Sequence, residues 1–208
     1  MQVAYADSSS ERAIDVRNAL MREYKMSNLR PAKQFLGLEI TRLPDGSIIL
    51  SQQTYIDSIL RRFHMEDANS APTPLHHKTR LDIDISTDRE ADSTMYQAIV
   101  GSLIYAATST WPDIANAVAA LSRYNTKLYT THMTAAKRVP RHLKGTKGFG
   151  LVFPGSSTSE AHTDILHCYT DSDFAGDRAD RKSQGGYFFR AYGAPIDWQS
   201  NKQLLVAT

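Results

Sequence analysis

The sequence predicts an α+β fold, because helical and strand-like patterns occupy separate parts of the chain. Apolar residues recur at helical intervals in residues 10–25, 53–63 and 95–144. Short strand-like runs bounded by turn residues occupy residues 35–51 and the region 150–199. These patterns indicate a helix and hairpin unit, then a helical segment, then a final antiparallel sheet.

The N-terminal third gives clear local signals. Ser8 and Glu11 have the spacing of a capping box, and the apolar residues that follow predict a helix to about Lys25. We expect the apolar stripe of this helix to lie in the core. Pro44-Asp45-Gly46 supplies turn chemistry between two strand-like runs, which predicts a β-hairpin. Residues 53–63 then return to helical periodicity.

The middle of the chain contains a predicted linker followed by helices. Residues 68–94 combine prolines and scattered charge with few large apolar groups, which is typical of a long connection. From Met95 the chain is strongly helical, and Thr110-Trp111-Pro112 starts a second helix, so we expect a helical hairpin. A third helix over 134–144 contains Pro140, which removes a backbone donor at a cost of about 3 kcal/mol. We expect that helix to be kinked or broken.

Composition limits the possible functions. The 208 residues include 41% hydrophobic residues, which suits one large domain or two small ones, and the net charge of +2 demands no polyanionic partner. The single Cys168 excludes an intrachain disulfide, and we expect it to be a small buried residue. The sequence shows no signal peptide, and no apolar run approaches the ~20 residues of a membrane span, so we expect an intracellular protein in the cytoplasm or nucleus.

The most informative motif is Thr170-Asp171-Ser172-Asp173-Phe174-Ala175-Gly176-Asp177, followed by Asp180-Arg181-Lys182-Ser183. Alternate residues of a strand share a face, so Asp171 and Asp173 would lie side by side, as a divalent metal or a shared proton requires. One carboxylate pair is a poor metal site. The Asp-x-Asp of a glycosyltransferase or the nucleophile strand of a haloacid dehalogenase phosphatase fits less well. Zinc-finger spacing is missing around His76, His77, His162, His167 and Cys168.

Three groups of blocks, in order along nearly the whole chain, resemble the C-terminal part of the Pol polyprotein of copia-type (Ty1/copia) LTR retrotransposons. The end of the family's reverse transcriptase resembles residues 35–40, 50–56 and 73–74. The segment that joins it to RNase H resembles residues 96–105, 112–114, 121–123, 132, 136–138 and 143–146. The opening strands of RNase H resemble residues 170–177, 181–183, 186–187, 196–198 and 202–203.

The resemblance implies four regions. Residues 1–67 would be the thumb-like C-terminal part of a reverse transcriptase, 68–94 a linker, 95–160 a helical connecting region and 161–208 a truncated RNase H-like antiparallel sheet. The polymerase Tyr-x-Asp-Asp turn would precede this chain, and Tyr5-Ala6-Asp7-Ser8 imitates it only superficially. No polymerase chemistry is therefore expected.

The resemblance also assigns Asp171 as the first catalytic aspartate and metal ligand of RNase H. The parent family acts as an RNA-directed DNA polymerase and an RNA–DNA hybrid ribonuclease, with Mg²⁺ or Mn²⁺ held by several carboxylates. The next ligand, a glutamate, would lie past Thr208. We therefore expect no stable metal binding and no catalytic activity from this chain, because a lone carboxylate holds Mg²⁺ weakly. The enzymatic alternative is a metal-dependent RNase H completed by a partner chain.

Basic residues support a second alternative, a nucleic-acid binding module. Residues in the third helix could follow the phosphates of an RNA:DNA hybrid or DNA duplex, and a solvated helix face favourable to the helix dipole explains them equally well. We expect neither a membrane nor a small-molecule substrate. The candidate nucleic-acid contacts are Lys137, Arg138, Lys144, Lys147, Arg181 and Lys182, with Arg141 in the same run.

Two positions depart from the family pattern. Pro140-Arg141-His142 stands where the family usually has Leu-Arg-Tyr, and Trp111 replaces the usual arginine before Pro112-Asp113-Ile114. Together with the predicted truncation at both ends, these departures suggest a further hypothesis. The chain would then be a degenerate insertion or an open reading frame domesticated by its host.

Overall fold

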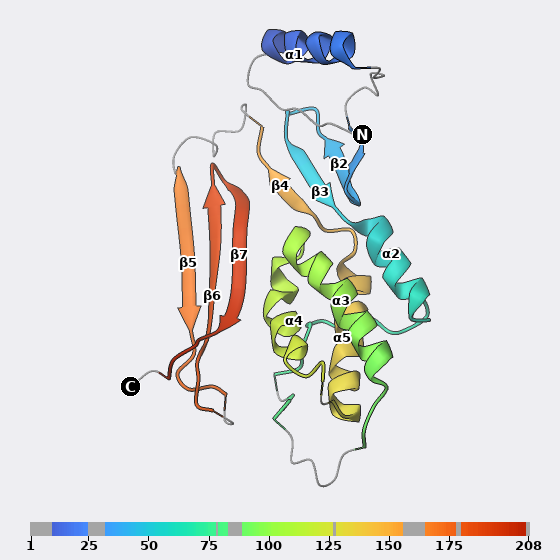
Figure 1. Cartoon of the computed structure of the whole chain (residues 1–208), viewed down its shortest axis with the longest axis vertical. Helices are drawn as coiled ribbons and strands as arrows, with labels where there is room; N and C mark the ends of the chain where they lie inside the picture. Colours follow the sequence, from blue (N-terminus) through green and yellow to red (C-terminus); the bar gives the residue numbers. More distant parts are fainter. Residues whose placement is uncertain are drawn as a thin grey trace.

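The prediction of an α+β fold is confirmed, because the helices other than the first form one body and the strands form two separate antiparallel sheets (Figure 1). None of the described helices is long and apolar enough to cross a lipid bilayer. A computed structural model describes residues 10–24, 32–77, 79–82, 89–126, 128–155, 165–177 and 180–206. Asp7 and His162, discussed above, lie outside these ranges.

The first sheet contains the predicted hairpin. β2 (Leu38–Arg42) and β3 (Ile48–Ser51) pair antiparallel across the predicted turn, with Glu39 opposite Ser51. β1 (Gln34–Phe35) pairs with β2, and β4 (Leu151–Phe153) pairs with β3, which confirms the strand expected after residue 150. The hairpin precedes the helical body in the sequence and β4 follows it, so this sheet joins the two ends of the helical segment.

The hydrophobic core lies among four helices. α2 (Gln53–Arg62), α3 (Ser93–Ser109), α4 (Ala115–Ser122) and α5 (Thr130–Thr146) pack together, and the short 3₁₀ helix η1 (Pro112–Ile114) leads into α4. The predicted helical hairpin is confirmed as α3 and α4. The largest fully buried apolar side chains all come from these helices and η1, namely Ile56, Tyr96, Ile99, Leu103, Ile114, Leu121 and Leu143.

Pro140 does not break α5, so that part of the prediction was wrong. The helix runs from Thr130 to Thr146 with Pro140 buried inside it. The proline removes one backbone donor, but α5 packs against α2, α3 and α4. Most helix stability in proteins comes from such packing, which here outweighs the loss of a single hydrogen bond.

The second sheet confirms the strands expected near the C-terminal end. β5 (Leu166–Ser172), β6 (Gln184–Ala191) and β7 (Ala194–Lys202) pair antiparallel in the order β5-β6-β7. β5 is an edge strand of this sheet, and most of its side chains are exposed. Cys168 is therefore exposed rather than buried, which corrects the expectation from sequence.

The first helix forms as predicted, but its apolar stripe is not part of the core. α1 (Ser10–Glu23) stands apart from the rest of the described chain (Figure 1). Ile14, Met21 and Tyr24 are exposed. The periodicity identified the helix correctly, but an apolar stripe shows only which face can be buried. Here no described helix or strand packs closely on that face.

Candidate carboxylate site and its attachment to the helices

Asp171 lies near the end of β5, opposite Gly186 of β6. Its carboxylate is exposed, and Oδ1 accepts a hydrogen bond from the Ser172 backbone N–H at 2.8 Å. Asp171 lines a groove of about 330 Å³ between the second sheet and the chain that enters α4. The groove is lined by Pro112, Ala115, Asn116, Asp171, Ser172, Asp173, Gln184, Gly185, Gly186, Tyr187, Phe188, Trp198, Gln199 and Ser200.

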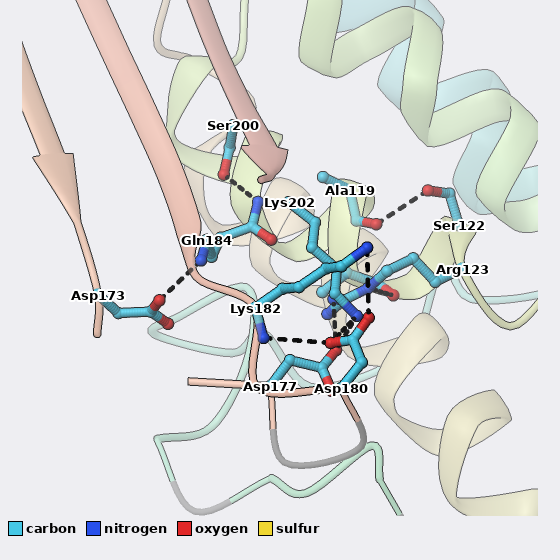
Figure 2. A network of polar contacts seen from close by, with 11 residues as sticks. Ala119, Ser122, Arg123, Asp173, Asp177, Asp180, Lys182, Gln184, Ser200 and Lys202 are labelled. Carbon is cyan, nitrogen blue, oxygen red and sulfur yellow. Dashed lines mark hydrogen bonds and ion pairs between the residues drawn. The ribbon is translucent and has the colours of Figure 1, made fainter. Parts of the chain in front are cut away.

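The carboxylate of Asp173 is held by the backbone of the neighbouring strand. Its Oδ1 accepts a hydrogen bond from the Gln184 N–H at 2.7 Å, as Figure 2 shows. Its own N–H donates to the Gln184 carbonyl at 3.1 Å. An added Cβ on Gly176 would lie 1.9 Å from Asp173 Oδ2, so a larger residue there would force the Asp173 carboxylate to move. Asp173 therefore closes the turn after β5.

Asp177 connects the second sheet to the helical body. Its Oδ2 lies 3.0 Å from Arg123 Nη1, just after α4, and 2.5 Å from Lys202 Nζ at the end of β7. Lys202 also lies 2.9 Å from Asp180 Oδ1 (Figure 2). The Asp177 side chain is only 15% exposed. We call Arg123, Asp177, Asp180 and Lys202 the attachment cluster.

In the attachment cluster, the two carboxylates of Asp177 and Asp180 are paired with the cations of Arg123 and Lys202. Burial opposes the charged form of Lys202, but hydrogen bonds to Asp177 and Asp180 outweigh burial and raise the pKa of Lys202 above its usual value. The hydrogen bond from Lys202 lowers the pKa of the exposed Asp180 carboxyl. Each acidic group in the cluster therefore faces a cation.

Two further hydrogen bonds attach the sheet to the helices. Trp198 Nε1 of β7 donates to the Ala107 carbonyl of α3 at 2.7 Å. Asn116 Nδ2 of α4 donates to Ser200 Oγ at 3.1 Å. Sequence reasoning did not identify Arg123 as a contact of the acidic motif, nor Asn116 and Trp198 as contacts between the sheet and the helices. Each partner lies far away in sequence, and no periodic signal pairs the two.

The acidic side chains that follow Asp171 in the motif have protein partners in this structure. Asp173 is bonded to the backbone of Gln184, and Asp177 is paired with Arg123 and Lys202. No group of three His, Cys, Asp or Glu side chains that could hold a metal exists among the described residues. Asp173 and Asp177 thus bind other parts of the protein, whereas the carboxylate of Asp171 is exposed.

The basic run of α5 faces a neighbouring chain segment. Arg138 donates from Nε to the Thr73 carbonyl at 3.0 Å, and Arg141 donates from Nε to the Asn69 carbonyl at 2.7 Å. Lys144 donates to the carbonyls of Glu66 and Ala68. We call residues 66–73 the strap, because these side chains hold it along α5.

The strap also packs closely against α5 at Gly145. A Cβ on Gly145 would lie 3.0 Å from the Ser70 Cβ of the strap. Lys147 does not touch the strap and instead pairs with Asp57 of α2 at 2.9 Å. Lys137 is half-buried on α5. In the described structure, four basic side chains of this run therefore bind the protein itself, namely Arg138, Arg141, Lys144 and Lys147.

The other two predicted nucleic-acid contacts lie in the loop between β5 and β6. Arg181 is exposed, has a φ of 60°, and donates its backbone N–H to the Asp177 carbonyl at 2.8 Å. Lys182 Nζ lies 4.0 Å from Asp180 Oδ2. The structure therefore places these two residues beside the attachment cluster and on a different element from the basic run of α5.

The family model for reverse transcriptase (RNA-dependent DNA polymerase) matches residues 3–77. The chain is 39% identical over 198 residues to the retrovirus-related Pol polyprotein from transposon TNT 1-94 of Nicotiana tabacum, covering 92% of this chain and 14% of that protein. It is 36% identical to the Pol polyprotein from transposon RE1 of Arabidopsis thaliana, covering 88% of this chain and 12% of that protein.

A shorter relative is similar in size to this chain. The uncharacterized mitochondrial protein AtMg00810 of Arabidopsis thaliana is 32% identical over 184 residues, which are 88% of this chain and 73% of that protein. The chain thus spans about one seventh of the length of the tobacco polyprotein and most of the length of this relative. No solved structure matches the chain.

Proposed function

Because the chain belongs to the Pol polyproteins of copia-type retrotransposons, we propose that it joins a reverse transcriptase to an RNase H-like domain and has no catalytic activity by itself. In this proposal the first sheet and α2 are thumb-like, the helices from α3 to α5 are the connecting region, and β5 to β7 begin the RNase H-like domain. The antiparallel order β5-β6-β7, with Asp171 on the first of these strands, supports the last assignment.

One observation carries the proposed lack of activity. The acidic residues that follow Asp171 in the motif already have structural partners: Asp173 bonds to the Gln184 backbone, and Asp177 pairs with Arg123 and Lys202. A two-metal hydrolase needs several carboxylates that face the same ions. If Asp177 turned toward a metal beside Asp171, Arg123 and Lys202 would lose their shared partner. The rest of the motif therefore serves to attach the sheet, and it provides no second carboxylate that could hold a metal together with Asp171.

Cleavage of a labelled RNA:DNA hybrid with Mg²⁺ or Mn²⁺ tests this proposal. We expect no cleavage by the purified chain, by Asp171→Asn, or by the control Asp197→Asn on β7 of the same sheet. Cleavage that is lost in Asp171→Asn and kept in Asp197→Asn would contradict the proposal. That result would favour a complete metal site assembled with another chain.

Nucleic-acid binding is the second candidate function, and the position of Arg181 favours it. Its side chain is exposed in the loop that follows the acidic motif, unlike the α5 residues that hold the strap. Lys182 follows it in the same loop and would add a second phosphate contact. We expect hybrid binding to weaken as salt rises, and to weaken further in Arg181→Gln/Lys182→Gln.

A matched control separates this loop from general basic charge. Arg61→Gln/Arg62→Gln removes the same charge from the exposed end of α2, away from the groove. Binding at low and moderate salt is measured for all three proteins. Equal losses in the two double variants would show that binding is not located at the loop, and no binding by the unaltered chain would exclude this candidate.

A further inference from the structure

Two buried histidines on α5 have opposite hydrogen-bonding surroundings. His132 is 2% exposed; its Nδ1 accepts from the Tyr129 N–H at 3.0 Å, and its Nε2 lies 2.8 Å from the Leu81 carbonyl. One nitrogen thus faces a donor and the other an acceptor. A neutral ring with its proton on Nε2 satisfies both partners.

His142 faces two acceptors. It is 6% exposed; its Nδ1 lies 3.2 Å from the Ala71 carbonyl of the strap, and its Nε2 lies 2.8 Å from Asp113 Oδ2 of η1. Carbonyl and carboxylate oxygens only accept, so both ring nitrogens need a proton. We propose that His142 is doubly protonated in the folded protein and acts as a pH-sensitive clasp that joins α5 to the strap and to η1.

The charges around His142 leave Asp113 as its ionic partner. α3 and α4 carry no charged side chain. Asp57 of α2 pairs with Lys147, and no contact joins Asp57 to the ring among the described residues. The other charged groups on these elements are Arg61 and Arg62 of α2, Glu66 and Asp67 of the strap, and Lys137, Arg138, Arg141 and Lys144 of α5. Of these, Arg138, Arg141 and Lys144 bond to strap carbonyls.

Loss of one proton from His142 would remove one of its two hydrogen bonds. Ala71 is only 5% exposed, so its carbonyl would be costly to leave without a donor, whereas the Asp113 side chain is 47% exposed and water can replace the ring there. Arginine does not lose its proton in proteins, so Arg138 and Arg141 stay charged as pH rises. The clasp should therefore weaken as pH rises while the arginine contacts of the strap persist.

Nitrogen-detected NMR of the histidine rings tests the protonation state directly. At pH 6 we expect His142 to show two protonated ring nitrogens, and His132 to show a single proton on Nε2. This measurement uses the unaltered chain and needs no variant to fold. A spectrum at pH 6 in which His142 carries only one ring proton would overturn the proposal.

Urea unfolding at a series of pH values tests the consequence. His142→Tyr keeps a hydroxyl that can donate toward Asp113 but removes the group that changes charge near neutral pH. We expect the urea midpoint of the unaltered chain to fall between pH 5.5 and pH 8 more steeply than that of His142→Tyr. The remaining histidines contribute equally to both proteins, so parallel curves would contradict the clasp.

Discussion

The helical body and the second sheet are built in different ways. The helices from α2 to α5, with η1, supply the fully buried apolar side chains, and no residue of β5, β6 or β7 belongs to their hydrophobic cluster, although Ala194 of β7 is buried. Through β7 the sheet packs against α4 and β4, and polar contacts join it to the helices, among them the Arg123–Asp177 ion pair and the Trp198–Ala107 hydrogen bond.

The motifs that the sequence shows in the two regions therefore have different structural roles. Motifs in the helical body, such as Tyr96 and Leu103, mark core packing, because these side chains are fully buried. The acidic motif of the sheet lies outside that core, where carboxylates can keep ionic partners. We infer that stability resides mostly in the helices and that the acidic motif fixes the position of the sheet.

The largest expected effect comes from the core. Leu103→Ala removes a side chain with 0% exposure and leaves a cavity, which should lower the free energy of unfolding by about 2–5 kcal/mol. Leu166→Ala in β5, where leucine is 60% exposed, should change it by less than about 0.5 kcal/mol. Urea unfolding followed by circular dichroism measures both. Similar losses in the two variants would remove the contrast between the regions.

The next effect concerns the attachment cluster. Asp177→Asn leaves Arg123 and Lys202 without their shared carboxylate, and hydrogen bonds to charged groups contribute about 1.5–3 kcal/mol. We expect a loss in this range, reduced by salt. A double-mutant cycle with Arg123→Gln isolates the pair. An effect of Asp177→Asn that stays the same when Arg123 is already absent would show that the pair contributes nothing.

A smaller effect should follow from the indole contact. Trp198→Phe keeps an aromatic ring in β7 but removes the donor to the Ala107 carbonyl, at an expected cost of about 1 kcal/mol. Trp111 remains as a buried fluorescent reporter of the helical body. Tyr169→Phe, which removes an exposed hydroxyl from β5, serves as the control and should be neutral. Resistance to limited proteolysis between β5 and β7 provides the second readout.

The smallest effect concerns the start of α2. Glu39 of β2 accepts from the Thr54 N–H at 2.7 Å and caps this helix from outside, since the Gln52 side chain makes no capping hydrogen bond. Hydrogen bonds from Thr54 lower the pKa of Glu39 below its usual value. Its contribution is therefore present above the ordinary range of glutamate and is lost as pH falls through the lowered folded-state pKa.

Glu39→Gln should cost about 0.5–1 kcal/mol at pH 7, in the range of capping effects, and almost nothing below pH 3. The control is Glu23→Gln at the exposed end of α1. Urea midpoints at both pH values measure the difference. A cost of Glu39→Gln that stays equal at the two pH values would argue against a role for the ionised carboxylate.

Local patterns predicted most elements, because helices and strands follow from periodicity and turn chemistry. The hairpin around Pro44-Asp45-Gly46 and the strand that carries Asp171 are examples. The errors at Pro140, Cys168 and the stripe of α1 share one cause: each depends on what packs against the element. Pro140 is buried in a packed helix, whereas Cys168 and Ile14 are exposed.

The candidate site was only partly predictable for the same reason. The sequence identified Asp171 and its acidic neighbours, but it could not show that Asp177 meets Arg123, which lies 54 positions away. Nor could it show that Arg138 and Arg141 face the strap. Such pairings depend on how the sheet and the strap pack against the helices, and no local spacing records them.

Hydrogen exchange of the unaltered chain and of Asp177→Asn tests most directly whether the acidic motif fixes the sheet to the helical body. We expect the amides of β5, β6 and β7 to exchange faster in Asp177→Asn, while those of α3 and α5 keep their rates. Unchanged exchange in the sheet, or an equal increase in the sheet and the helices, would contradict the account.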